Sequence, residues 1–175
     1  MSRYGIIVNV DRCAGCFACA VACKEENQVA PGIFWEKIKR DENVSDNVIN
    51  WFRMSCMHCD DPACMKVCPM KAIHKGPHGE VLVDQQKCIG CKMCANACPY
   101  DVPVFNTEGR TSYFGDKQPL VVRPAKPHTE RTPGKAEHCT LCVHRTERGL
   151  LPACVEACGI HAMTLVDYDN PTPET

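Results

Sequence analysis

The chain has 175 residues, of which sixteen are cysteine, and its formal net charge is −1. This near-neutral charge gives no reason to expect nucleic-acid binding, and no window is long and apolar enough to predict a transmembrane helix. Aromatic residues make up only 6% of the chain, and the 45% hydrophobic share includes the cysteines. A small domain with so little ordinary core material is expected to need bound metals or covalent staples.

The predicted elements before the second cysteine group form a short unit with an insertion. A β-branched run at residues 5–10 predicts a strand. Residues 18–24 predict a short helix that carries the fourth cysteine of the first group. Residues 27–50 contain a Pro-Gly pair and are expected to form a loop or linker inserted into the frame, or a docking surface for a partner.

Similar units recur around the later cysteine groups. Residues 71–84 predict a β-hairpin, because two apolar runs flank a Gly-Pro-His-Gly turn. Residues 95–98 predict another short helix, and apolar stretches follow at 102–105 and 162–166. Residues 107–136 are rich in proline, glycine and charge, and they are expected to be a second insertion that serves as a linker or docks a partner.

Two further sets of side chains each have two interpretations. Aromatic residues beside the first insertion either pack in the core or anchor a partner: Phe34, Trp35, Trp51 and Phe52. Histidines beside the cysteines either tune a metal site and relay protons, or simply pack: His58, His138 and His144.

The sixteen cysteines fall into four groups of four, with none left over. The groups are Cys13, Cys16, Cys19, Cys23; Cys56, Cys59, Cys64, Cys68; Cys88, Cys91, Cys94, Cys98; and Cys139, Cys142, Cys154, Cys158. The first and third groups have the complete CxxCxxCxxxC spacing, which is the bacterial ferredoxin pattern for binding [4Fe–4S] cubanes. The other two are variants of it, so the sequence predicts four cubanes.

Disulfides and zinc are the competing interpretations of these cysteines. The close CxxC spacing and the missing export signal argue against a disulfide scaffold. Zinc ribbons use two CxxC pairs some distance apart, whereas here three cysteines are closely spaced and a fourth follows. The iron–sulfur interpretation is therefore favoured.

The spacing also indicates how a group shares its ligands. A CxxCxxC loop wraps one cubane, while the fourth cysteine lies on the following helical turn and points to the cluster of a partner group. Small residues between the cysteines, such as Ala14, Gly15 and Gly90, let backbone N–H groups approach the sulfurs.

With these four groups in this order, the chain resembles the iron–sulfur electron-transfer subunits of the dimethyl sulfoxide reductase family of molybdopterin oxidoreductases. The resemblance extends over residues 4–166. It rests on the phrases CKEEN, CMHCDDPACMKVCPMKAI, CIGCKMCANACPY and CTLCVHRTERGLLPACVEAC. One departure is Gly159, which follows Cys158 where many relatives have proline. Cys91 is present, so the resemblance implies four cubanes rather than a [3Fe–4S] cluster.

The resemblance implies an α+β fold made of two bacterial-type 2[4Fe–4S] ferredoxin modules with loop insertions. One module combines residues 1–49 with 137–175, the other spans 50–106, and 107–136 is an insertion. The implied ligand sets are Cys13, Cys16, Cys19, Cys158 for cluster 1; Cys23, Cys139, Cys142, Cys154 for cluster 2; Cys56, Cys59, Cys64, Cys98 for cluster 3; and Cys68, Cys88, Cys91, Cys94 for cluster 4. Cluster 1 would lie nearest the catalytic subunit.

The implied function is anaerobic respiratory electron transfer, with no catalytic residue in this chain. Single electrons would pass to or from a large subunit that holds a molybdenum or tungsten bis-pterin, with a membrane anchor or quinol-side donor as a further partner. The alternatives are the iron–sulfur subunit of a hydrogenase or formate-dehydrogenase-type complex, and the small subunit of an aromatic hydroxytransferase-type enzyme. The chain is expected in the cytoplasm, or in the periplasm after folded export with a signal-bearing partner.

Overall fold

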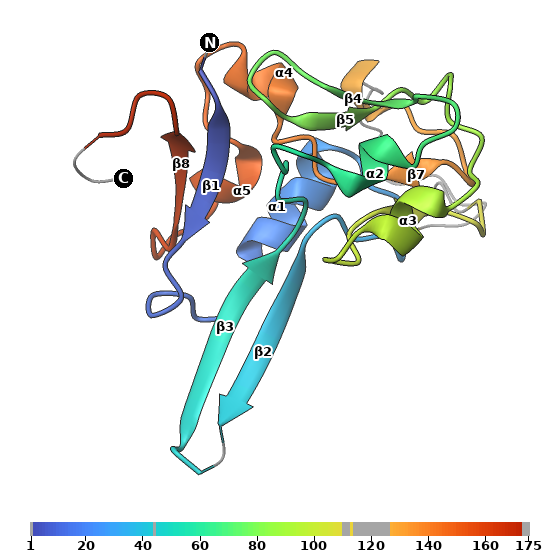
Figure 1. Cartoon of the computed structure of the whole chain (residues 1–175). Helices are drawn as coiled ribbons and strands as arrows, with labels where there is room; N and C mark the ends of the chain where they lie inside the picture. Colours follow the sequence, from blue (N-terminus) through green and yellow to red (C-terminus); the bar gives the residue numbers. More distant parts are fainter. Residues whose placement is uncertain (1, 44, 110–112, 114–126, 173–175) are drawn as a thin grey trace.

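The structure is a computed structural model that describes residues 2–43, 45–109, 113 and 127–172. Short helices and strands alternate along the chain (Figure 1). Their order is β1 (Tyr4–Val8), α1 (Ala18–Glu26), β2 (Lys37–Asn43), β3 (Val48–Met54), α2 (Ala63–Lys66), β4 (Ile73–Lys75), β5 (Val81–Val83), α3 (Met93–Ala97), β6 (Val104–Phe105), the 3-10 helix η1 (Pro127–Thr129), β7 (Ala136–Glu137), α4 (Val143–Thr146), α5 (Ala153–Glu156) and β8 (Met163–Asp167).

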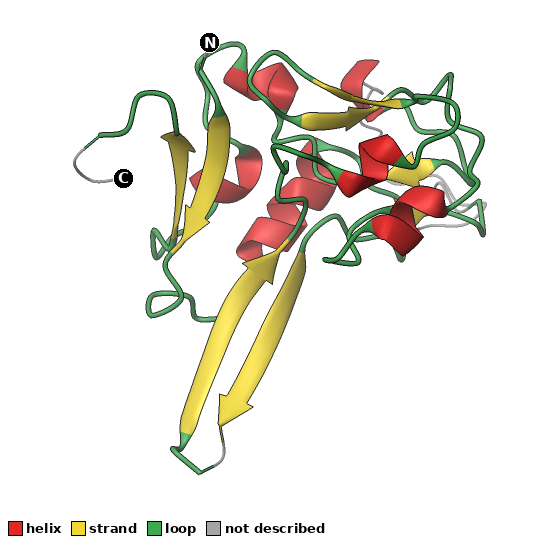
Figure 2. Ribbon diagram, in the orientation of Figure 1, coloured by secondary structure: helices red, strands yellow, loops and turns green. Residues whose placement is uncertain are grey.

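The described strands pair into four separate antiparallel ribbons (Figure 2), so the fold is of the α+β type with small sheets. Two ribbons are local hairpins, β2–β3 and β4–β5. The others join distant segments: β1 lies beside β8, with Tyr4 opposite Asp167, and β6 lies beside β7. The hairpin expected at 71–84 is confirmed as β4–β5, and the helix expected at 18–24 is confirmed as α1.

The cysteine groups come together in two neighbourhoods. Helix α1, which carries the end of the first group, contacts α5, which carries part of the fourth. Helix α2 of the second group contacts α3 of the third. In Figure 1 the elements β1, β8 and α5 lie on the left, α2, α3, β4 and β5 lie on the right, and α1 lies between them.

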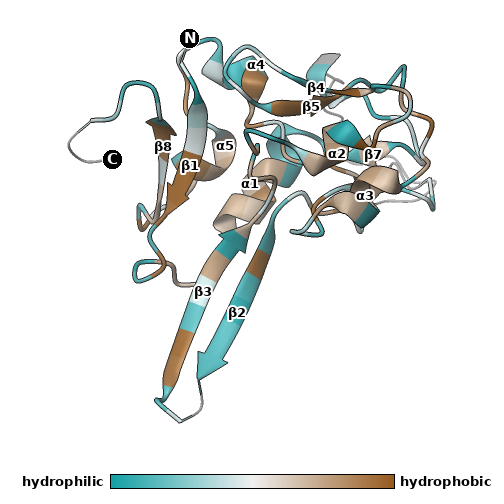
Figure 3. Cartoon of the chain, in the orientation of Figure 1, coloured by the Kyte–Doolittle hydropathy of each residue, from teal (hydrophilic) through white to brown (hydrophobic). Residues whose placement is uncertain are grey.

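The second half of the first insertion is not a loop, so the loop expectation was wrong for that part. It contains β2 and the start of β3, which form a hairpin that projects from the body (Figure 1). The sequence pattern missed it because β2 reads KIKRDEN and lacks alternating apolar residues (Figure 3). Cross-strand contacts stabilise the arm instead, with the Arg40 guanidinium over the Trp51 ring at 5.7 Å.

The cysteines are themselves a large part of the core. One buried cluster combines Cys19, Cys154 and Cys158 with Val155, Ala162 and Met163. Another packs Cys94 with Ile73, Val81 and Ala136. A core made partly of thiols is expected to depend on what those thiols bind.

The aromatic residues beside the insertion divide between the two interpretations. Trp35 is a core residue, 3% exposed, whereas Phe34 is 46% exposed. Trp51 and Phe52 are half-buried and lie in the middle of the hairpin, opposite Arg40 and Lys39. Among the described residues, no helix has the length and apolar character needed to cross a bilayer.

Candidate metal centres

The four cysteine groups share one backbone conformation. In every group the residue before the second cysteine has a positive φ: Gly15 (65°), His58 (46°), Gly90 (72°) and Leu141 (53°). Left-handed residues turn successive N–H groups toward one side of the loop, which creates a concave site for an anion. The loops are therefore shaped for a negatively charged cluster before any ligand is considered.

The turn after the fourth cysteine is also repeated. Lys71, Asp101 and His161 each have a positive φ and donate an N–H bond to the carbonyl of the cysteine three residues earlier, at 3.1, 3.3 and 2.9 Å. The turn at His161 is of this kind although Gly159 replaces the proline that follows the other two cysteines. Gly159 therefore preserves the local geometry.

All sixteen cysteines are free thiols, and the structure gathers twelve of them around three cavities. Their cysteine linings are Cys13, Cys16, Cys19, Cys158 for the first; Cys23, Cys139, Cys142, Cys154 for the second; and Cys68, Cys88, Cys91, Cys94 for the third. Each cavity takes three thiols from one group and one from its partner group. Four convergent thiols are the donor set that a cubane requires.

The remaining four thiols influence one another through space. Burial raises the pKa of Cys56 to about 12, and the Cys139, Cys64 and Cys59 thiols contribute to the rise. Burial is also the main cause of the raised pKa of Cys64, and the Cys98 and Cys59 thiols contribute to it. Cys56, Cys59 and Cys98 therefore each lie close enough to Cys64 to interact with it, and Cys56 also interacts with Cys139.

Backbone donors reach several of the sulfurs. Ala72 N–H donates to Cys68 Sγ and Ala162 N–H donates to Cys158 Sγ, both at 3.3 Å. Leu141 N–H reaches Cys139 Sγ at 3.4 Å. Such bonds favour the thiolate over the thiol and tune the potential of a bound cluster. The donor sets and their hydrogen bonds fit iron–sulfur clusters.

Comparison with known proteins also indicates iron–sulfur cluster binding. A family model described as a 4Fe-4S dicluster domain matches residues 48–113 and 123–168. The arsenate respiratory reductase iron–sulfur subunit ArrB of Shewanella sp. (strain ANA-3) is 36% identical over 97% of this chain and 83% of its own length. One chain of the anaerobic dimethyl sulfoxide reductase of Escherichia coli (strain K12) is 34% identical over 97% of the present sequence and 76% of its own. The protein belongs to the iron–sulfur subunits of the dimethyl sulfoxide reductase family.

A third relative of this family is a subunit of the tetrathionate reductase of Salmonella typhimurium, 36% identical over 97% of the present sequence. The chain spans 60% of that subunit's length. The resemblance inferred from the cysteine-containing phrases is thus confirmed, and 4Fe-4S binding is the family property that the thiol cavities reflect.

An ion pair lies at the base of the hairpin of this iron–sulfur subunit and was not foreseen from its sequence. Arg53 Nη2 donates to Glu36 Oε1 at 2.8 Å, and their side chains are 6% and 1% exposed. The same Nη2 lies 3.9 Å from Cys139 Sγ. Burial alone would lower the pKa of Arg53, but Glu36 and the Cys154 and Cys139 thiols raise it above its usual range. The guanidinium therefore stays charged.

The histidines beside the cysteines have structural partners. His58 Nδ1 accepts the Val81 N–H at 2.9 Å, and burial lowers the His58 pKa to about 3. His138 Nδ1 lies 2.8 Å from the Cys139 carbonyl, which only a protonated nitrogen can bond. Burial lowers the His138 pKa as well. Both rings are therefore neutral and hold loops in place, which agrees with the packing interpretation.

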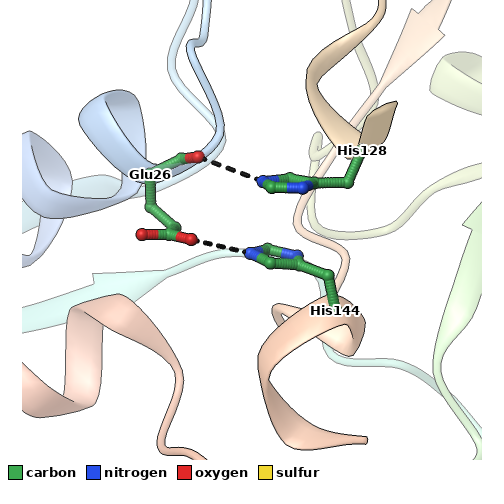
Figure 4. Close-up of side chains that lie close together, drawn as sticks. All are labelled: Glu26, His128 and His144. Atoms are coloured by element: carbon green, nitrogen blue, oxygen red, sulfur yellow. Dashed lines mark hydrogen bonds and ion pairs between the residues drawn. The ribbon is translucent and has the colours of Figure 1, made fainter. Parts of the chain in front are cut away.

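His144 belongs to a cluster that joins three parts of the chain (Figure 4). Its Nε2 lies 2.9 Å from Glu26 Oε1, its ring stacks on that of His128 at 3.5 Å, and His128 Nε2 lies 3.3 Å from the Glu26 carbonyl. The three residues offer donor atoms within 4.8 Å of one another. However, the rings are parallel within 10°, and Arg145 Nη1 lies 3.3 Å from Glu26 Oε2. Parallel lone pairs and an adjacent cation disfavour a metal ion, so the cluster ties η1 to α1 and α4.

Proposed function

We propose that this chain is an electron-transfer subunit that relays single electrons through four [4Fe–4S] clusters to or from a molybdenum or tungsten bis-pterin catalytic subunit. The observation that carries the proposal is the convergence of thiols from different groups around common cavities. The sixteen cysteines divide into four sets of four, and the relatives are named as parts of arsenate, tetrathionate and dimethyl sulfoxide reductases.

The proposed ligand sets pair group one with group four and group two with group three. Three sets rest on the cavity linings described above. The set Cys56, Cys59, Cys64, Cys98 rests on the mutual influence of its thiols and on the contact between α2 and α3.

The same pairing supports two ferredoxin modules. The module of residues 1–49 and 137–175 is held by the β1–β8 ribbon and the α1–α5 contact. The module of residues 50–106 contains the β4–β5 hairpin and the α2–α3 contact. The hairpin β2–β3 crosses the proposed boundary at residue 50, so its second strand begins in one module and ends in the other.

In this function the chain holds the clusters, shields them from water and tunes their reduction potentials. One-electron exchange is the chemistry that a bound cubane supplies. The thiolates fix each cluster, and backbone N–H groups at Cys68, Cys139 and Cys158 stabilise the negative charge on sulfur. Buried sets exclude water, because Cys23, Cys139, Cys142 and Cys154 are all buried.

The catalytic partner is proposed to dock where cluster 1 approaches the surface. Cys16 is exposed, and Phe17 and Val21 beside it are 47% and 63% exposed. A partner covering these apolar side chains would bring its own redox centre near the cluster. The insertion 107–136 is a second docking candidate, but residues 110–112 and 114–126 lie outside the described residues.

The compartment follows from assembly. Because the thiols are core residues, we infer that the clusters are inserted before any export and that the chain remains in the cytoplasm or crosses the membrane folded with a signal-bearing partner.

The deciding experiment is anaerobic isolation of the complex from its own host, with iron, acid-labile sulfide, zinc, nickel, molybdenum and tungsten counted per chain. We expect about sixteen iron atoms from this chain, plus molybdenum or tungsten in a large co-purifying subunit. Iron at that level with nickel, or without molybdenum and tungsten, would favour a different complex. Zinc in place of iron would overturn the proposal.

A further inference from the structure

The buried ion pair lies at the junction of two proposed cluster sites. Arg53 lines the cavity of Cys13, Cys16, Cys19 and Cys158. Glu36 lines the cavity of Cys23, Cys139, Cys142 and Cys154. The hairpin supplies both charges, because Glu36 immediately precedes β2 and Arg53 is on β3. The hairpin therefore brings one cation and one anion to the two cluster sites formed by groups one and four.

Each partner of the pair keeps a polar atom that bonds to nothing among the described residues. These atoms are Arg53 Nε and Glu36 Oε2, and both are buried. A buried guanidinium N–H without an acceptor is costly unless a ligand satisfies it. The cavity that Arg53 lines would hold cluster sulfides and thiolates, which accept N–H bonds.

The pair lies beside groups one and four. Arg53 Nη2 is 3.9 Å from Cys139 Sγ. The cavity that Arg53 lines and the cavity that Glu36 lines together contain all eight cysteines of these two groups. The cavity of Cys68, Cys88, Cys91 and Cys94 has neither Arg53 nor Glu36 in its lining.

A fixed charge beside a cluster changes its reduction potential, because reduction adds a negative charge. A cation favours the reduced state and an anion disfavours it. Since the protein interior screens charges weakly, a buried pair acts on its nearest clusters far more than on distant ones. At a distant cluster the electrostatic effects of the two opposite charges nearly cancel, whereas at a cluster in contact with one of them they do not.

We propose that the buried charges of Arg53 and Glu36 together set the reduction potentials of clusters 1 and 2 relative to those of clusters 3 and 4. Arg53 raises the potentials of the first two clusters, and Glu36 limits the rise. The pair thereby sets the driving force of the electron step between the two modules. This inference rests on the proposed four-cluster function.

The test uses the holo complex and the variant Glu36→Gln, which removes the negative charge but keeps the shape and an acceptor for Arg53. The guanidinium keeps its proton in proteins, so one uncompensated positive charge remains. The matched control is Glu42→Gln on the same hairpin, where Glu42 pairs with Arg40 and is 41% exposed. Potentials are measured by anaerobic redox titration followed by electron paramagnetic resonance, with signals assigned by Cys19→Ser and Cys94→Ser variants.

We expect Glu36→Gln to shift the reduction equilibria of clusters 1 and 2 at least tenfold toward the reduced state, about 59 mV for a one-electron couple. Cluster 4 should move much less, and Glu42→Gln should move none of the four by this amount. Arg53→Met should shift clusters 1 and 2 in the opposite direction, with Arg40→Met as its control. The double variant Glu36→Gln/Arg53→Met should return toward the wild-type potentials.

The outcomes separate this inference from the proposed function. Unchanged potentials in Glu36→Gln, or an equal shift of all four clusters, would overturn the inference while leaving the four-cluster relay intact. If Arg53→Met loses iron, the Glu36→Gln variant and its Glu42→Gln control still decide the question. A wild-type complex without four clusters would instead overturn the proposed function.

Discussion

Gly90, in the loop of the third cysteine group, offers a sharp test of how tightly the second insertion closes over a cluster. Its φ is +72°, and a Cβ placed there would overlap the Gly134 carbonyl oxygen, with the carbonyl carbon at 3.3 Å. Gly149 has the same φ of +72° but has no atom within 4 Å of such a Cβ. The two glycines therefore share the backbone conformation and differ in the space around it.

The structure gives the size of the expected difference. Alanine in the left-handed region costs about 1–2 kcal/mol at either position. At Gly90 the overlap with backbone adds about 1–3 kcal/mol, because the obstructing atom is a carbonyl that cannot rotate away like a side chain. Gly90→Ala should thus be less stable than Gly149→Ala by that added amount alone.

The assay is the rate at which visible cluster absorption disappears in guanidinium under anaerobic conditions, since cluster loss makes unfolding irreversible. If the overlap is relieved before the rate-limiting step, Gly90→Ala should lose clusters about 5- to 150-fold faster than Gly149→Ala, at 1.36 kcal/mol per tenfold. The signal of cluster 4, whose proposed ligand set includes Cys91, should disappear before the signals of the other clusters. Equal rates for the two variants would refute the close contact between Gly90 and Gly134.

Three further predictions follow from the core and from cluster exposure. Trp35→Phe removes the Nε1–H donor that lies 3.2 Å from Glu137 Oε2 and should destabilise the protein by about 1–3 kcal/mol, seen as faster cluster loss in guanidinium than in a Trp51→Phe control; equal rates would contradict the role of this bond. Anaerobic chelation of iron should abolish most of the far-ultraviolet circular dichroism, because cysteines make up much of the core, and a cooperative unfolding transition in the iron-free chain would argue against this. After limited treatment with ferricyanide and full re-reduction with dithionite, clusters 1 and 4, whose sets include exposed Cys16 and Cys91, should have lost more of their reduced-state paramagnetic signal than cluster 2, whose four cysteines are buried; the reverse order would exclude the proposed ligand sets.

The sequence predicted the local elements around the cysteines well, because each has a strong short-range signal. The strand expected at 5–10 overlaps β1, and the apolar stretches at 102–105 and 162–166 contain β6 and most of β8. The hairpin at 71–84 carried both apolar runs and turn residues. The hairpin β2–β3 was missed because one of its strands is almost entirely polar and is stabilised by its partner strand.

The candidate site divides in the same way. Cysteine spacing alone pointed to all sixteen cysteines as the proposed ligands, but the division into sets came from family resemblance. The Arg53–Glu36 pair joins the residue before β2 to a residue on β3, in a region that had been expected to be a loop and its flank. The Glu26–His144 contact spans 118 residues and has no local signature. Polar contacts between distant residues depend on the folded arrangement, which periodicity does not report.

The β1–β8 ribbon also constrains the order in which the protein folds during its synthesis. Val8 pairs with Met163, so this ribbon cannot form until almost the whole described chain has left the ribosome. Residues 56–98, in contrast, hold two complete cysteine groups within one short stretch. The proposed module of residues 50–106 could therefore bind its clusters while the last four cysteines, which belong to the other proposed module, are still being synthesised. Nascent chains would pass through a half-loaded stage, in which Cys13, Cys16 and Cys19 need protection from oxygen and stray metals.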